Sequence, residues 1–460
     1  MIQLKDILTA TNGKLLLGDD NTQFKGISID SRKVEEGCLF IPIIGERFDG
    51  HRFIEDALDM GAIGTLTSKK INFNNDSKKC IIMVEDTLKA LQDISKYFLN
   101  KANTPVVGVT GSTGKTTTKE LIYNVLAQEY KVLRNEGNFN NHIGLPLTLL
   151  NIKDEHEIIV LEMGMSGSGE IDLLAEITNP EVGVITNIGV CHIENLGSKE
   201  EIFKAKMELK NYMDESSVLI VNGDDEYLGK IRSEDTIYRK IFTGLKEDND
   251  IHVTKTNDLG YDGVEFSAVI DGETYDFKLN VPGIHNVYNA LLAIGVGIHY
   301  NISLDKIKIG LSSFGGNKMR LNIVELEDDI KLINDCYNAN PDSMRAALSV
   351  LASIEAKRKI AVLGDMLELG DYSEASHREI GKMAFEKGID FILTVGKDAV
   401  NIANGAIESG FAKERVFAVN NNITASNVLN ILKKSGDLLL IKGSRGMKME
   451  EIVQYLQERR

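Results

Sequence analysis

Apolar positions in the first hundred residues follow two spacings. Helical spacing predicts a short amphipathic helix at the start, a second helix over residues 51–62 and a third that ends near Asn100. Short apolar runs between these helices predict strands over residues 24–31, 38–43, 63–68 and 80–86. We therefore expect a small α/β domain at this end of the chain.

A different pattern begins after residues 101–105. The β-branched run of residues 105–111 stops at a glycine, which predicts the first buried strand of a parallel sheet. Similar runs, each ending in Gly, Asn or a carboxylate, predict further strands over residues 131–135, 157–164, 182–189 and 217–223. After Lys246 the pattern changes to alternating strands and then helices, over residues 264–270, 274–280, 285–300 and 303–314.

The last part of the chain repeats a strand followed by a helix. The expected strands are residues 331–335, 359–365, 391–396, 415–419 and 437–444. The predicted fold class is thus α/β, with a small first domain and two doubly wound domains after it. The predicted boundaries are residues 1–103, 104–315 and 316–460, in line with the two to four domains expected for 460 residues.

Composition and charge narrow the possible partners. Apolar residues make up 43% and charged residues 26% of the chain, which is typical of a folded globular protein. The net charge, 52 − 68 = −16, repels phosphate backbones and anionic lipid, so we expect neither nucleic acid nor a membrane as partner. The four cysteines form no CxxC pair, and no run has the length of a membrane span or signal peptide. We therefore expect a protein of the cytoplasm.

The most informative motif follows the strand of residues 105–111 and precedes a predicted helix. It consists of Gly111, Ser112, Thr113, Gly114, Lys115, Thr116 and Thr117. In a phosphate-binding loop of this kind, glycines turn backbone N–H groups onto phosphate oxygens, Lys115 reaches the terminal phosphates and Thr116 ligates Mg²⁺. The full pattern has a glycine where this chain has Val109, so the match is to the shorter GxxGKT form. The alternative is that these residues form an ordinary glycine-rich turn, in which Lys115 and Thr116 occur together by chance.

Two further side chains are candidates for a metal site. Glu162 ends one predicted parallel strand and His192 follows another by a short loop, so both lie at carboxyl ends of strands, where ligands gather. With Thr116 and phosphate oxygens they complete an oxygen-rich Mg²⁺ site, although histidine is an uncommon magnesium ligand. The alternatives are an exposed carboxylate at a strand end and an ordinary loop histidine.

Long segments of the chain resemble the Mur ligases, and within that family the branch that adds D-alanyl-D-alanine. The segments are SRKVEEGCLFIPIIGERFDGHRF, VTGSTGKTTTKE, NEGNFNNHIGLPLTLL, LEMGMSGSGEI, TNIGVCHIENLGSKEEIFKAKMEL, GIHNVYNALLA, DCYNANPDSMRAAL, LGDMLELG and KGSRGMKMEEIV. The resemblance implies a UDP-sugar (UDP-MurNAc) domain, a central P-loop ATPase domain and a C-terminal Rossmann-like domain that binds ATP and the incoming D-alanyl-D-alanine.

The resemblance also implies a reaction. ATP phosphorylates the terminal carboxylate of a UDP-MurNAc-tripeptide, and the amine of D-alanyl-D-alanine attacks the acyl phosphate. The products are the UDP-MurNAc-pentapeptide of peptidoglycan precursor synthesis, ADP and phosphate. We expect positioning and charge neutralisation to do most of this work.

The resemblance assigns catalytic and metal roles residue by residue. Lys115 and Thr116 keep the roles given above, and Glu162 and His192 are expected to ligate Mg²⁺. Lys206 matches the family's carbamylated lysine, whose added CO₂ turns a cation into an anion that faces the metal. Lys204 is two residues earlier and points to another helix face, so only one of the two can reach the site.

Four more residues are assigned to ATP. Asn286 and Asn289 share a helix face and suit amide contacts to adenine, with helix capping as the alternative. Arg320 resembles an arginine that reaches ATP from the hinge region, the alternative being a surface arginine. Asp335 ends a strand, where a carboxylate can hold ribose hydroxyls or merely form a turn.

The remaining assignments concern the other substrates. Tyr337, Asn338 and Asn340 are expected near the incoming dipeptide, although Asn340 suits a helix cap equally well. The expected contacts to the UDP-sugar are Ser31, Arg32, Asp49, Gly50 and His51. The expected contributors to the tripeptide and phosphate channel are Asn138, Asn140 and Asn141, for which a polar turn is the alternative.

Three other functions compete with this interpretation. A sister Mur ligase that adds a single amino acid shares the ATPase and the metals, but the DNPR-type motif of the branch that adds a diamino acid is missing. A folate-type glutamate ligase has no use for a UDP-sugar domain. A regulatory module that binds ATP without ligation has no need of Lys115, Glu162, His192 and Lys206 and could lose any of them. All four are present, which argues against this function. We expect a monomer whose partners are the small-molecule substrates.

Overall fold

The computed structural model describes residues 1–45, 48–70 and 79–458, which form two compact units. The first unit contains residues 1–107, 131–164 and 170–180. The second contains residues 108–130, 165–169 and 181–460. No helix in the described ranges is long and apolar enough to cross a membrane.

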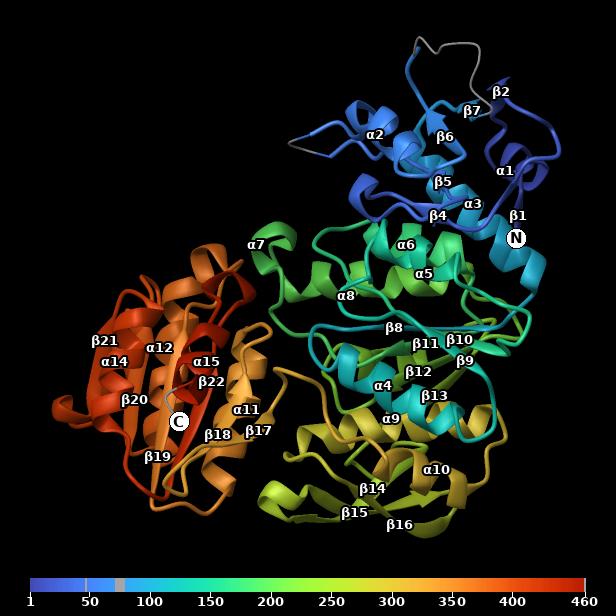
Figure 1. Cartoon of the computed structure of the whole chain (residues 1–460). Helices are drawn as coiled ribbons and strands as arrows, with labels where there is room; N and C mark the ends of the chain where they lie inside the picture. Colours follow the sequence, from blue (N-terminus) through green and yellow to red (C-terminus); the bar gives the residue numbers. More distant parts are fainter. Residues whose placement is uncertain (46–47, 71–78, 459–460) are drawn as a thin grey trace. The chain divides into compact units, whose positions relative to one another are not determined.

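The first unit contains a small mixed sheet (Figure 1). Its strands follow the order β2-β7-β6-β5-β4; β4 to β7 run parallel, and β2 is antiparallel to β7. The elements up to residue 102 are β1 (Ile2–Gln3), α1 (Leu4–Thr11), β2 (Lys14–Leu17), β3 (Gln23–Phe24), β4 (Ile27–Ser28), β5 (Leu39–Phe40), α2 (Ile54–Asp59), β6 (Gly64–Thr67), β7 (Cys80–Met83) and α3 (Thr87–Ala102).

Helix α3 shows how the sequence defines these elements. The Asp86 carboxylate accepts hydrogen bonds from the backbone N–H groups of Leu88 and Lys89, at 2.7 and 2.9 Å, and so caps the first turn. The helix ends at Asn103, which takes the left-handed conformation. Its apolar face packs into a core with residues of α1 and the sheet. The later elements of this unit are β9 (Val132–Arg134), α5 (Gly144–Leu149), β10 (Ile158–Glu162) and α6 (Glu170–Thr178).

The second unit contains a larger sheet with the strand order β16-β15-β14-β13-β12-β11-β8. Strands β11 to β14 run parallel, and β15 is antiparallel to both of its neighbours, β14 and β16. The strands are β8 (Val106–Thr110), which starts in the first unit, β11 (Val182–Ile185), β12 (Val218–Asn222), β13 (Arg239–Gly244), β14 (Ile251–Asp258), β15 (Val264–Ile270) and β16 (Glu273–Leu279). The helices are α4 (Lys115–Leu126), α7 (Ile193–Leu196), α8 (Lys199–Met207), α9 (His285–His299) and α10 (Leu304–Ser312).

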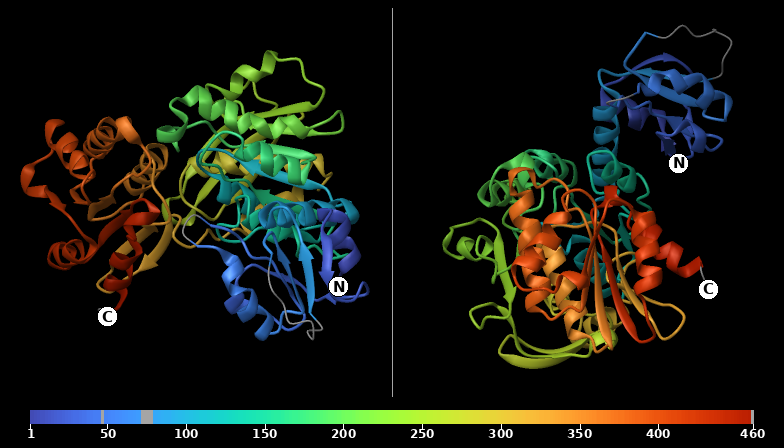
Figure 2. Two further views of the ribbon diagram at one scale, coloured as in Figure 1. Left: turned by 90° about the horizontal axis from the view of Figure 1, so that it is seen from above. Right: turned by 90° about the vertical axis from the view of Figure 1, so that its left-hand side faces the viewer.

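A second sheet in this unit has the order β17-β18-β22-β19-β20-β21, with β18 to β22 parallel and β17 antiparallel at the edge. The right-hand view of Figure 2 shows helices on both faces of these orange and red strands. The strands are β17 (Asn322–Glu325), β18 (Lys331–Asp335), β19 (Arg358–Gly364), β20 (Phe391–Val395), β21 (Val416–Val419) and β22 (Asp437–Lys442). The helices are α11 (Pro341–Ser353), α12 (Ser373–Glu386), α13 (Val400–Glu408), α14 (Asn422–Leu432) and α15 (Glu450–Glu458).

The α/β class and the doubly wound sheets are confirmed, and several elements differ from expectation. Strands β13, β14 and β17 were not predicted, because they carry many polar residues and much of β14 and β17 is exposed. Helix α8 ends at Met207 and is followed by a 3-10 helix over Glu208–Tyr212. All four cysteines are free and buried.

A buried ion pair fixes one end of the second sheet and gives a stability prediction. Arg358 donates to both carboxylate oxygens of Asp437, at 2.8 and 2.6 Å, and the Asp437 side chain is 1% exposed. Arg358→Ala is expected to destabilise the fold by about 3–5 kcal/mol, because it leaves a buried carboxylate without its countercharge. Lys382, in an exposed pair with Glu386, is the matched control, and Lys382→Ala is expected to cost about 0.5 kcal/mol or less. Urea unfolding of the two variants measures the difference; equal midpoints would contradict the prediction.

Candidate active site

The predicted phosphate loop lies between β8 and the N-terminus of α4, as the sequence indicates. Gly111 and Gly114 have φ angles of +148° and +79°, which favour glycine. A Cβ atom at Gly111 would lie 1.8 Å from the Thr186 hydroxyl oxygen, and one at Gly114 would lie 2.5 Å from Asn289 Oδ1. The residue after β11 and helix α9 therefore leave space only for bare backbone at these two positions.

Backbone and side-chain bonds hold the loop in place. The Ser112 and Thr113 N–H groups donate to the backbone oxygen and side-chain oxygen of Asn187, both at 3.0 Å. Lys115 Nζ donates to the carbonyl oxygen of Gly111 at 2.8 Å, so its ammonium group lies over the loop. Asn187 was not among the predicted residues, and its position directly after β11 is the signal that could have indicated it.

The two asparagines assigned to adenine lie on α9 and are 5% exposed. Asn289 donates to Asn286 Oδ1 at 3.0 Å and accepts from the Thr118 hydroxyl at 3.1 Å. Asn286 donates to the carbonyl oxygen of Pro282 at 2.8 Å. The structure thus brings Asn289 to the phosphate loop, where it links α9 to α4, and Asn286 hydrogen-bonds Asn289 within α9.

Lys206 and Lys204 have opposite surroundings. The Lys206 side chain is 2% exposed, whereas Lys204 is 57% exposed and pairs with Glu201 at 2.8 Å. Burial, and then the nearby charge of Lys115, lower the pKa of Lys206 to about 7. A lysine with this pKa is about half neutral at pH 7, and only the neutral amine adds CO₂.

His192 follows β11, takes a left-handed conformation with φ of +59° and begins α7. Its Nδ1 atom is buried and has no aligned hydrogen-bond partner among the described residues.

Thr116 lies at the first turn of α4, and the Arg320 guanidinium donates to its hydroxyl oxygen at 2.9 Å. The same guanidinium stacks on the Tyr337 ring, 4.1 Å from its centroid.

Asp335, assigned to ribose, lies in a hydrogen-bond network at the carboxyl end of β18. Its carboxylate accepts from the backbone N–H of Leu321 at 3.2 Å and from Lys442 Nζ at 2.6 Å. Lys442, 2% exposed, also donates to the carbonyl oxygen of Asn338 at 2.9 Å. Lys442 was not among the predicted residues, because its partner Asp335 lies 107 positions away in the chain.

The other residues expected near the dipeptide form turn and cap contacts. Asn338 Oδ1 accepts from the backbone N–H of Arg445 at 3.3 Å. Asn340 caps α11 in a capping box with Ser343, which is the alternative given for it above. Both lie at the carboxyl edge of the second sheet, where a ligand of a doubly wound domain is expected.

Glu162 belongs to the first unit and ends β10. Its carboxylate accepts from Asn140 Nδ2 at 2.8 Å, and Asn135 hydrogen-bonds its backbone on both sides, at 2.9 Å each. Asn141 caps α5 through the N–H groups of Ile143 and Gly144 at 3.2 and 2.9 Å, whereas Asn138 is exposed. Asn140 therefore orients Glu162, and Asn135 is a supporting residue that the sequence did not reveal.

The residues assigned to the UDP-sugar surround two short 3-10 helices of the first unit, Ser31–Lys33 and Gly50–Phe53. Arg32 pairs with Asp30 at 2.9 Å and its side chain is 85% exposed. Asp49 accepts from His51 Nδ1 at 2.7 Å and pairs with Lys69, while His51 Nε2 accepts from the Ser68 N–H at 3.1 Å. Lys69 adds a cation to this cluster that the motif alone did not indicate.

Three family models match the chain in succession. They are the Mur ligase family catalytic domain at residues 23–99, the Mur ligase middle domain at 109–297 and the Mur ligase glutamate ligase domain at 319–445. The chain belongs to the Mur ligase family. The phosphate loop, His192 and Lys206 lie in the middle-domain match, and Arg320, Asp335 and Lys442 lie in the glutamate-ligase match.

Individual Mur ligases align over nearly the whole chain. The UDP-N-acetylmuramoyl-tripeptide–D-alanyl-D-alanine ligase of Bacillus subtilis is 43% identical over 95% of this chain and 94% of its own length. The enzyme of the same name from Escherichia coli is 35% identical over 99% and 98%. A crystal structure of MurF from Acinetobacter baumannii superposes with a TM-score of 0.91 at 31% identity, covering 99% of each chain. MurF of Thermotoga maritima in complex with ADP gives a TM-score of 0.83 at 29% identity, covering 94% and 97%.

The residues of this Mur ligase suit a magnesium ion that takes few protein ligands. No group of three or more His, Cys, Asp or Glu side chains that could hold a metal occurs within the described ranges. Mg²⁺ does not need such a cage, because it keeps several waters and binds substrate phosphates with one or two protein groups. A carboxylate oxygen lies 2.6 Å from His192 Nδ1, so Nε2 is the ring nitrogen of this side chain that suits a ligand.

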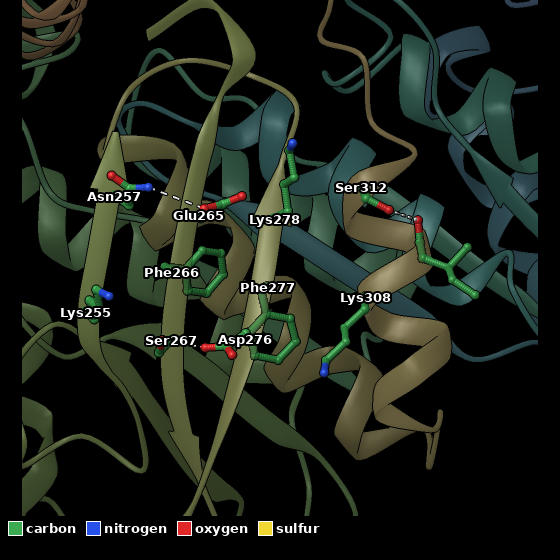
Figure 3. Close-up of a pocket in the computed structure, with 11 residues that line it drawn as sticks. Lys255, Asn257, Glu265, Phe266, Ser267, Asp276, Phe277, Lys278, Lys308 and Ser312 are labelled. Carbon is green, nitrogen blue, oxygen red and sulfur yellow. Dashed lines mark hydrogen bonds between the residues drawn. The ribbon is translucent and has the colours of Figure 1, made fainter. Parts of the chain in front are cut away.

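A separate hollow of about 580 Å³ lies over β14, β15, β16 and α10 (Figure 3). Lys255, Lys278 and Lys308 line it together with Glu265 and Asp276, so its charges nearly cancel. None of the residues assigned to substrate or metal lines this hollow.

Proposed function

We propose that this chain joins D-alanyl-D-alanine to a UDP-N-acetylmuramoyl-tripeptide at the expense of ATP. The observation that carries the proposal is the 43% identity, over 95% of the chain, to a relative named for this reaction. The intact phosphate loop, with Lys115 lying over it, supports the use of ATP. The product is the pentapeptide precursor of peptidoglycan.

The chemistry consists of two group transfers. The terminal carboxylate of the tripeptide attacks the γ-phosphorus of ATP, which forms an acyl phosphate and releases ADP. The neutral amine of the dipeptide then attacks the acyl carbon, a tetrahedral intermediate forms, and the C–O bond to phosphate breaks as the amine loses its proton. Because the bond changes need little covalent help, the protein contributes mainly by positioning the reactants and neutralising charge.

Lys115 and the loop handle the transferred phosphoryl group. The ammonium group of Lys115 is held over the loop by the Gly111 carbonyl, from which it can move to a phosphate oxygen. Mg²⁺, when bound, neutralises charge on the phosphate oxygens. Thr116 and His192 would hold the ion, and the sequence adds Glu162 as a further ligand.

We also propose that Lys206 is carbamylated. Its burial supports this, because a charged ammonium group is costly at a 2% exposed position. Addition of CO₂ to the neutral amine releases a proton and gives an anionic carbamate. That anion would face the metal, whereas an ammonium group would repel it.

The other substrates are assigned to the predicted domains, with residues 1–103 for the UDP-sugar, 104–315 for ATP and 316–460 for ATP and the dipeptide. The three family matches, 23–99, 109–297 and 319–445, fall inside these ranges and support them. We assign the polar cluster of Asp49, His51 and Lys69 to binding of the UDP-sugar.

We place the reaction in the cytoplasm, since it consumes ATP and the four cysteines are free.

The test is a comparison of acceptors with purified protein, Mg²⁺-ATP and the UDP-tripeptide. We expect phosphate release to depend on D-alanyl-D-alanine, and mass spectrometry to show the pentapeptide. Single D-alanine, L-lysine, diaminopimelate and glutamate are the matched alternatives. Release driven by a single amino acid would assign the chain to a sister ligase, and ATP binding without any acceptor-dependent release would leave a regulatory module.

A further inference from the structure

A carboxylate outside the assigned set lies against the proposed metal ligand His192. Glu368 Oε2 is 2.6 Å from His192 Nδ1. The histidine side chain is 18% exposed and the glutamate 56% exposed, so the contact lies at the edge of the buried site. The two atoms are close but not aligned as a hydrogen bond, since Nδ1 counts as unsatisfied among the described residues.

The loop that carries Glu368 is anchored on both sides. Glu368 has a left-handed backbone, with φ of +63°, and its carbonyl oxygen accepts from the N–H of Glu194 in α7 at 3.4 Å. On the other side, the N–H of Leu367 donates to the Ser444 hydroxyl oxygen at 2.9 Å. A sparsely populated backbone conformation that is held from two directions is typical of a functional position.

Carboxylates in this position have a known effect on metal-binding histidines. A histidine that ligates a metal through one ring nitrogen usually donates the N–H of the other to a carboxylate, which fixes the tautomer and the ring orientation. With Glu368 at Nδ1, the favoured tautomer of His192 carries its proton on Nδ1. The lone pair of Nε2 is then available to a ligand.

The two residues come from different parts of the chain. His192 belongs to the middle-domain match and Glu368 to the glutamate-ligase match. A second contact joins the same parts, because the Val190 N–H donates to Asp342 Oδ2 at 3.3 Å. Val190 lies two residues before His192, so both contacts meet at the loop after β11.

We propose that Glu368 is a positioning residue that acts through His192, so that the histidine is oriented for the metal only while the C-terminal part is seated on the loop after β11. The proposal rests on the proposed function, in which His192 is a metal ligand. It gives the half-exposed carboxylate a task in the reaction without contact to substrate. It also ties completion of the metal site to the domain that is expected to bring the dipeptide.

The first test is nuclear magnetic resonance of metal-free protein with nitrogen-15 in its histidines. We expect His192 to carry its proton on Nδ1 in the unmodified chain and in Glu368→Gln, whose amide oxygen can accept the same bond. Glu368→Asn is one methylene shorter and tolerates the left-handed backbone. In this variant we expect the proton to shift toward Nε2, the tautomer that imidazole favours in water. An unchanged His192 spectrum in Glu368→Asn would overturn the proposal.

The second test measures the metal dependence of phosphate release. We expect Glu368→Asn to raise the half-saturating Mg²⁺ concentration about 10-fold or more, with the KM for the UDP-tripeptide unchanged, and Glu368→Gln to restore most of the loss. Asp371→Ala, an exposed carboxylate in the same loop, is the control and should match the unmodified chain. Equal Mg²⁺ dependence in Glu368→Asn and Asp371→Ala would contradict the proposal. If the unmodified chain releases no phosphate, the proposed function fails, while the tautomer result still decides whether Glu368 orients His192.

Discussion

Lys115→Met is expected to slow dipeptide-dependent phosphate release by about 10³-fold or more at saturating ATP. The reason is that Lys115 holds a positive charge over the phosphate loop, with its ammonium group 2.8 Å from the Gly111 carbonyl oxygen. Methionine keeps most of the side-chain volume and removes the charge. Initial rates from a coupled phosphate assay measure the effect.

The matched control for this variant is Lys246→Met, which removes an exposed lysine elsewhere in the same unit. We expect its rate to equal that of the unmodified chain, and both variants to unfold at similar temperatures. A Lys115→Met enzyme that keeps a tenth or more of the activity would remove Lys115 from the phosphoryl transfer, and with it the assigned role of the loop.

Lys206→Met is expected to have the second-largest effect, a loss of about 10²-fold or more in kcat. The variant cannot form a carbamate, so the anion expected to face the metal is missing. We expect the variant to fold, because methionine is apolar and of similar length to lysine. It therefore removes the cost of burying the Lys206 amine. Steady-state kinetics and thermal unfolding together separate the loss of activity from a loss of structure.

Lys204→Met is the control for Lys206→Met, since Lys204 lies on the same helix and is 57% exposed. Mass spectrometry of the native protein in bicarbonate should show a mass increase of one CO₂ that Lys206→Met abolishes and Lys204→Met keeps. A fully active Lys206→Met enzyme, or a carbamate that persists in it, would contradict the assignment.

The sequence predicted the parts of this molecule that depend on short-range patterns. The phosphate loop of residues 111–117 is recognisable because strand, glycines and helix follow one another, and the structure has them in that order. The strands of the C-terminal sheet were predicted for a similar reason, since each is a buried apolar run. In contrast, β14 and β17 are partly exposed, and their polar residues hide the alternation on which a strand prediction depends.

The supporting residues were missed because their partners are distant in the chain. Lys442 begins the segment KGSRGMKMEEIV, but nothing in that segment indicates that it meets Asp335 across 107 positions. Asn135 brackets Glu162 from 27 positions away. Glu368 belongs to a motif that was noticed, LGDMLELG, but its contact with His192 depends on the packing of two domains. Asn135, Glu368 and Lys442 all belong to segments that resemble the family, but the pairs that they form are set by the tertiary fold and cannot be predicted from one segment.

The most direct test of the central claim follows one oxygen atom. The UDP-tripeptide is labelled with oxygen-18 in its terminal carboxylate and incubated with the enzyme, Mg²⁺-ATP and D-alanyl-D-alanine, and the pentapeptide and phosphate are analysed by mass spectrometry. A ligase that works through an acyl phosphate transfers one labelled oxygen to the released phosphate for each pentapeptide formed, and this is the result we predict. Unlabelled phosphate, or phosphate released without pentapeptide, would contradict it.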